Sequence, residues 1–96
     1  MSDAKDSLSE DLTDIRTQID EIDIALEALI SKRAALAKQI GEAKRNDVNS
    51  GVVEFYRPER EAQVLRAVAE RNEGPLENDE MVRLFREIMS ACRAYE

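Results

Sequence analysis

The chain has 96 residues, enough for one folded domain with a single modest core. Its composition is typical of an all-helical protein, with 43% hydrophobic residues, three glycines, two prolines and no tryptophan. The net charge of -7 argues against nucleic acid or an anionic membrane as a partner, because surplus lysine and arginine bind phosphate groups. A site for a small anion would therefore have to be a local basic pocket.

The rare residue types exclude several kinds of chemistry. With no histidine and a single cysteine, Cys92, a zinc or other transition-metal site is not expected. Cys92 has no histidine to activate it as a nucleophile and no second cysteine for an internal disulfide. The sequence contains neither a signal peptide nor an apolar run of about 20 residues. We therefore expect a cytoplasmic protein that uses no metal and no cofactor.

A long first helix is predicted from about Leu8 to about Arg45, after a disordered polar tail over residues 1–7. These 38 residues would span about 57 Å, whereas a compact chain of this size has a diameter of about 32 Å. We expect a second copy of the chain to share the apolar seam of this helix, in a symmetric dimer. The seam has spacings of four and three residues and consists of Leu8, Leu12, Ile15, Ile19, Ile22, Leu26, Leu29, Leu36, Ile40 and Ala43.

Two shorter helices are predicted after a linker. Pro58 suits the first turn of a second helix that ends near Asn72, before Gly74 and Pro75 stop it. A third helix is predicted to begin at a cap formed by Asn78 or Asp79. Its apolar face consists of Met81, Val82, Leu84, Phe85, Ile88, Met89, Cys92 and Tyr95. The predicted fold class is therefore all-α, with three helices of which the first is very long.

Several charged residues occupy apolar faces of these helices. Arg33 interrupts the seam, where a guanidinium without an anionic partner would cost several kcal/mol. Lys44 lies eleven residues later, about 20° around the helix and about 16 Å along it, so both side chains can converge on a small anion. Glu61 lies on the inner face of the second predicted helix, with Arg60 beside it. Glu96 is the last position on the apolar face of the third predicted helix. Charged groups gathered in this way are typical of functional sites.

Each of these residues also has an ordinary structural explanation. Lys44 near a helix C-terminus is favourable through the helix dipole alone, and Arg60 and Glu61 are common surface residues in a first helical turn. An intramolecular bridge between Arg33 and Glu61 would satisfy both charges. A residue at a chain terminus, such as Glu96, is normally frayed. The combination of three cations and two carboxylates is what favours a site.

The sequence resembles the all-helical chorismate mutases, most closely the mutase domain at the N-terminus of bifunctional chorismate mutase/prephenate dehydratases. The resemblance covers about residues 8–96 and is carried by the runs LTDIRTQIDEIDIALEALISKRAALAKQIGEAK, FYRPEREAQVL and MVRLFREIM. It implies an intertwined homodimer that converts chorismate, a small dianion, to prephenate in phenylalanine and tyrosine biosynthesis. This Claisen rearrangement is unimolecular and needs no nucleophile, metal or cofactor.

The resemblance assigns roles to individual residues. Arg33 would bind a substrate carboxylate, Lys44 would contact a carboxylate and the ether oxygen, and Glu61 would accept a hydrogen bond from the ring hydroxyl. Arg60 would line the pocket. Arg16 would reach the site from the partner chain, in keeping with its separation of about 25 Å from Arg33 along the helix.

The chain also departs from the family at several positions. Glu96 stands where many members have a glutamine that donates to the ether oxygen, so Glu96 must be protonated to donate. Cys92, assigned to substrate binding, is a weaker donor than the serine of some relatives, and Arg57 stands where some have aspartate. The bifunctional relatives continue beyond the position of Glu96 into a dehydratase domain. The chain is therefore either a domain of such a fused protein or a mutase that stands alone.

Two other functions remain as alternatives. An isochorismate pyruvate-lyase has the same fold and a similar basic pocket, although the run FYRPERE favours the mutase of phenylalanine synthesis. A non-catalytic helical dimerisation module would tolerate the loss of Arg33. Identification of the product and replacement of Arg33 distinguish these functions from a chorismate mutase.

Overall fold

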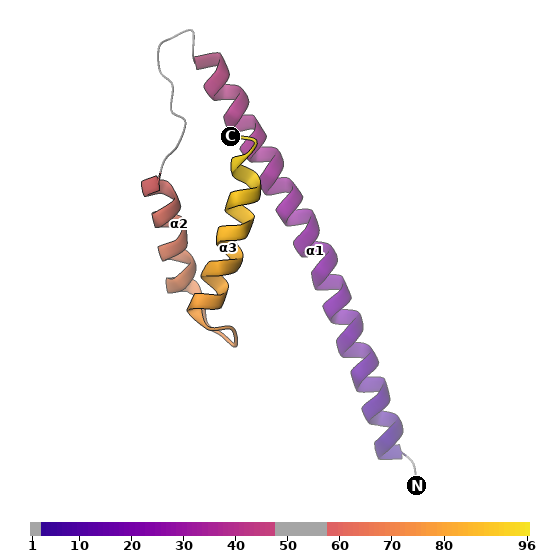
Figure 1. Cartoon of the computed structure of the whole chain (residues 1–96). Coiled ribbons are helices and arrows are strands. Elements are labelled where there is room, and N and C mark those ends of the chain that lie inside the picture. The colour runs from indigo at the N-terminus through magenta and orange to yellow at the C-terminus, as the bar shows by residue number, and fades with distance from the viewer. Residues whose placement is uncertain (1–2, 48–57) are drawn as a thin grey trace. The chain divides into compact units, whose positions relative to one another are not determined.

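The structure is a computed structural model that describes the backbone of residues 3–47 and 58–96, and side chains from residue 10 to 46 and from 58 onward. In these residues it contains three helices and no strand (Figure 1). Helix α1 runs over Asp3–Asp47, α2 over Pro58–Arg71 and α3 over Asn78–Arg93. The predicted all-α class with a very long first helix is therefore confirmed.

Helix α1 begins at Asp3 rather than near Leu8, so most of the polar segment expected as a tail has a helical backbone. The chain divides into two compact units, residues 1–32 and 33–96, and α1 contributes to both. Within the first unit, α1 is the only element that the structure describes. A single helix with an apolar stripe is marginal in water unless another element covers the stripe.

The seam is an apolar surface in this chain and not its core. In the first unit Leu12 and Ile19 are 52% and 50% exposed, and Leu29 is 63% exposed. In the second unit Leu36 and Ile40 are also about half exposed. No element described in the same unit covers the seam, and its burial by a second copy of the chain stays a prediction.

Helices α2 and α3 lie side by side as a helical hairpin in the second unit (Figure 1). Their core contains Val68, Met89 and Cys92, which are 3%, 6% and 1% exposed. All three residues belong to the apolar faces that helical periodicity predicts. Burial of these faces holds together two helices that are too short to be stable alone.

The turn between α2 and α3 is held by the side chain of Asn72. Its Nδ2 donates to the carbonyl oxygen of Leu76 and to Oδ1 of Asn78, both at 2.8 Å. Gly74 has φ of +82°, a conformation that side chains disfavour.

The predicted N-cap of α3, Asn78 or Asp79, was wrong. The N-cap residue is Glu77, whose backbone N–H donates to the Glu80 carboxylate at 3.4 Å.

The last turns of α1 contact the C-terminal turn through small residues. Gly41 is buried, and a methyl group there would collide with the carbonyl oxygen of Tyr95 and lie 3.3 Å from Cα of Glu96. Ala37, one turn earlier, is 5% exposed. Because Gly41 lacks a side chain, the backbone of residues 95 and 96 lies directly on α1. Within the second unit, α1 therefore uses the face of Ala37 and Gly41, beside the seam.

Candidate functional site

The predicted site residues are divided between the two units. The second unit contains the six residues Arg33, Lys44, Arg60, Glu61, Cys92 and Glu96, and the first unit contains Arg16. Arg16 is exposed on α1. These six residues come from the C-terminal part of α1, the first turn of α2, the last turn of α3 and the turn that follows it.

Arg33 and Lys44 lie about 20° apart around the axis of α1 and therefore share one face of this helix. Both are half-buried, whereas Lys32 and Arg45, the residues beside them, are exposed. Between them on this face is Gly41, because steps of three or four residues return to one side of a helix. The two cations therefore lie on either side of the contact with the C-terminal turn.

The contact at Gly41 brings the backbone of Glu96 close to Lys44. Gly41 and Lys44 are neighbours on one helix face, where residues three apart have Cβ positions about 5–6 Å apart. The C-terminal turn is ordered by hydrogen bonds from the backbone N–H groups of Tyr95 and Glu96 to the carbonyl oxygens of Cys92 and Arg93, each 3.0 Å. The Glu96 side chain is exposed. The carboxyl group of Glu96 and the ammonium group of Lys44 thus lie at the same end of the second unit.

Glu61, in the first turn of α2, pairs with Arg93 in the last turn of α3. Arg93 Nε donates to Oε1 of Glu61 at 2.8 Å, and a terminal nitrogen of the guanidinium donates to the same oxygen. The side chains are 26% and 47% exposed. An anion at a helix N-terminus and a cation at a helix C-terminus are both favourable. The hydrogen bonds described for Glu61 thus go to Arg93, whereas the sequence left a bridge to Arg33 open.

The remaining predicted residues differ in accessibility. Arg60 is exposed beside Glu61. Cys92 is 1% exposed, so in this chain its thiol belongs to the hairpin core, while the other predicted site residues are exposed or half-buried. Arg57 lies outside the described residues. Cys92 is therefore the predicted residue with the least access to a ligand in the chain as described.

Two residues of this region were missed in the sequence. Helical periodicity places Arg93 on the exposed face of the third helix. It reaches Glu61, 32 residues away, because the ends of α2 and α3 lie together. Gly41 is the single glycine of α1, and an isolated glycine in a strong helical pattern often marks a close packing contact. That signal identifies Gly41 as a contact position but does not name the segment that packs on it.

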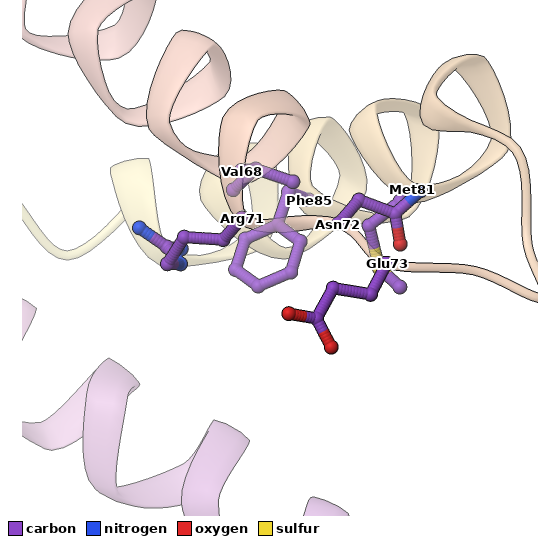
Figure 2. Close-up of a pocket in the computed structure, with 6 residues that line it drawn as sticks. All are labelled: Val68, Arg71, Asn72, Glu73, Met81 and Phe85. Atoms are coloured by element: carbon purple, nitrogen blue, oxygen red, sulfur yellow. The ribbon is translucent and has the colours of Figure 1, made fainter.

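A separate cavity of about 330 Å³ lies near the turn between α2 and α3 (Figure 2). It is lined by Val68, Arg71, Asn72, Glu73, Met81 and Phe85. Both helices line it, α2 with Val68 and Arg71 and α3 with Met81 and Phe85 (Figure 2). None of the seven predicted site residues lines this cavity, so it is not the candidate site.

Among the described residues, no group of three or more cysteine, aspartate and glutamate side chains is placed to hold a metal ion. Among the helices described, none is long and apolar enough to cross a membrane.

Comparison with known proteins gives one family and several bacterial relatives. Residues 15–96 match the family described as "Chorismate mutase type II". The chain is 48% identical over 83 residues to a bifunctional chorismate mutase/prephenate dehydratase of Pseudomonas aeruginosa, covering 85% of this chain and 23% of that protein. A protein of the same name from Stutzerimonas stutzeri is 46% identical over 91 residues, which are 94% of this chain and 25% of that protein. The chain therefore spans about a quarter of the length of these relatives.

Proposed function

Since the chain belongs to the type II chorismate mutase family, we propose that its helical domain converts chorismate to prephenate. In this rearrangement the ether C–O bond of chorismate breaks as a new C–C bond forms within the same molecule. An enzyme must hold the dianion in its compact conformer and stabilise the negative charge that grows on the ether oxygen. The observation that carries the proposal is the pair of half-buried cations, Arg33 and Lys44, on one face of α1.

The roles that we propose for the site residues are those implied by the resemblance to the family, and the chemistry of each side chain suits its role. Arg33 clamps a substrate carboxylate, because a guanidinium forms two parallel hydrogen bonds to such a group. Lys44 places its ammonium group at the ether oxygen, and protonated Glu96 donates a hydrogen bond to the same atom. Glu61 accepts a hydrogen bond from the ring hydroxyl, and Arg60 lines the pocket. Cys92, a weak donor, would have to reach the substrate from the hairpin core, where it is 1% exposed.

The active form that we propose is a homodimer in which the seams of two α1 helices pack together. Full burial of a leucine or isoleucine is worth about 1.5–3 kcal/mol, so each half-exposed seam residue has about 1 kcal/mol to gain. Eight such residues in each chain give a total of the order of 15 kcal/mol for the dimer, against an association cost of about 4–15 kcal/mol. The eight residues are Leu12, Ile15, Ile19, Ile22, Leu26, Leu29, Leu36 and Ile40.

The dimer also supplies the residue that the second unit lacks. Arg16 belongs to the first unit, and about 25 Å of helix separate it from Arg33. A small substrate bound to Arg33 therefore cannot also reach Arg16 of the same α1 helix. We assign Arg16 to the active site of the partner chain.

We also propose a fused dehydratase region and a location in the cell. The relatives are named for both a mutase and a prephenate dehydratase, and prephenate is the product of the mutase. A dehydratase region fused to this domain would therefore receive its substrate from the mutase. The proposed location is the cytoplasm, because the lone cysteine gives no internal disulfide.

The test is the loss of chorismate absorbance after purified protein is added, with the product identified. Formation of prephenate supports the proposal, whereas release of pyruvate from isochorismate as the main activity would indicate a pyruvate-lyase. Arg33→Ala serves as a control and should abolish turnover while circular dichroism still shows a helical protein. A folded wild-type protein that leaves chorismate unchanged would refute the proposal.

A further inference from the structure

We propose that Arg93 is a positioning residue that orients the Glu61 carboxylate toward the ring hydroxyl of the substrate. This inference rests on the proposed function and adds a residue to it. The bonds between Arg93 and Glu61 join the last turn of α3 to the first turn of α2, at the end of the hairpin where the C-terminal turn meets α1. Arg93 acts on the substrate through Glu61.

The geometry of the pair suits this role. Two nitrogens of the Arg93 guanidinium donate to Oε1 of Glu61, one of them at 2.8 Å. An ionised carboxylate has two oxygens with about four acceptor sites. Because both bonds converge on Oε1, Glu61 can accept the substrate hydroxyl through Oε2 without losing either bond to Arg93.

The elements that carry the two residues are fixed relative to each other. Cys92 precedes Arg93 and is 1% exposed in the core between α2 and α3. A glutamate has three rotatable side-chain bonds, and without an anchor it samples several rotamers. Holding the Glu61 carboxylate before the substrate binds lowers the entropic cost of forming the hydrogen bond to the hydroxyl.

A purely structural role explains the pair less well. Its side chains are 26% and 47% exposed, and ion pairs with this degree of exposure contribute little to folding stability. An effect on substrate orientation does not depend on a large contribution to stability. Activity and stability should therefore respond differently when Arg93 is replaced.

The experiment compares Arg93→Met with wild type on two substrates: chorismate and an analogue in which hydrogen replaces the ring hydroxyl. We expect Arg93→Met to lower kcat/KM for chorismate about tenfold, the scale of one hydrogen bond to a charged group. The two proteins should use the analogue equally well. Arg93→Lys should recover part of the loss, because an ammonium group donates to Glu61 but lacks the two-nitrogen fork.

Two further variants separate positioning from structure. Arg86→Met removes an exposed arginine from nearly the same face of α3, about 10 Å nearer its N-terminus, and should leave kcat/KM unchanged. In a Glu61→Ala background, Arg93→Met should cause no further loss, because the residue through which it acts is gone.

Three results would overturn the role of Arg93 while leaving the mutase function intact. They are wild-type kcat/KM in Arg93→Met, an equal loss on the analogue, and a full additional loss in the Glu61→Ala background. An equal loss on the analogue would mean that Arg93 serves another part of the substrate or the fold. If the wild-type protein does not convert chorismate at all, the proposed function fails and the role of Arg93 falls with it.

Discussion

Replacement of Gly41 by alanine tests whether the close contact between α1 and the C-terminal turn serves the active site. A methyl group at this position would collide with the carbonyl oxygen of Tyr95 and lie 3.2 Å from its carbonyl carbon and 3.3 Å from Cα of Glu96. All three atoms belong to the backbone, so no side-chain rotation relieves the overlap. The C-terminal turn must move away from α1, and Glu96 must move with it.

Two opposing terms set the effect of Gly41→Ala on stability. Alanine favours the interior of a helix over glycine by about 0.5–1 kcal/mol. Overpacking a buried position costs about 1–3 kcal/mol. The net change in the free energy of unfolding should therefore be a loss of about 0–2 kcal/mol, small enough for the protein to stay folded. A shift of about 1 Å in a catalytic group can lower the rate about a hundredfold, so activity should suffer far more than stability.

The assay measures kcat/KM for chorismate together with thermal unfolding of each variant. Gly41→Ala should lower kcat/KM by at least about tenfold, and adding it to Glu96→Ala should lower the rate little further. Glu42→Ala, an exposed change at the next position of α1, is the control and should keep wild-type activity. A folded Gly41→Ala protein with wild-type kcat/KM would refute the claim that this contact positions Glu96.

The other predictions concern the two groups assigned to the ether oxygen. Lys44→Ala should lower kcat at least about a hundredfold with a small change in KM, because the ammonium group stabilises charge that exists only in the transition state; a change confined to KM would indicate uniform binding instead. For Glu96, an amide can take the place of the proposed donor, so Glu96→Gln should keep kcat/KM near the wild-type value, whereas Glu96→Ala should lower it at least about tenfold; equal kcat/KM in the three proteins would exclude the role.

Local patterns predicted most of the secondary structure correctly. Pro58 begins α2 as expected, because its fixed φ and missing N–H suit a first helical turn. The cap of α3 was predicted one or two residues late. Asparagine and aspartate are favoured N-cap residues, which pointed to Asn78 or Asp79. The N-cap residue is instead Glu77, whose backbone N–H donates to the Glu80 carboxylate. The choice among adjacent polar residues depends on where the preceding turn ends, which periodicity does not specify.

Tertiary contacts were less accessible from the sequence. The seam of α1 was predicted from its spacing, but spacing does not specify what covers it, and Leu36 and Ile40 are about half exposed in this chain. The contact between α1 and the C-terminal turn is at Gly41, which has no side chain and is therefore not part of an apolar pattern. The pairing of Glu61 with Arg93 depends on how two helix ends meet, and the sequence equally allowed Arg33 as the partner.

The central claim is that each active site combines Arg33 of one chain with Arg16 of its partner. The most direct measurement mixes two inactive proteins, Arg16→Ala and Arg33→Ala, under conditions of subunit exchange. In a mixed dimer, one site loses both arginines and the other keeps both, so statistical exchange should restore about a quarter of wild-type activity. Verified mixed dimers that show no chorismate mutase activity would contradict the claim.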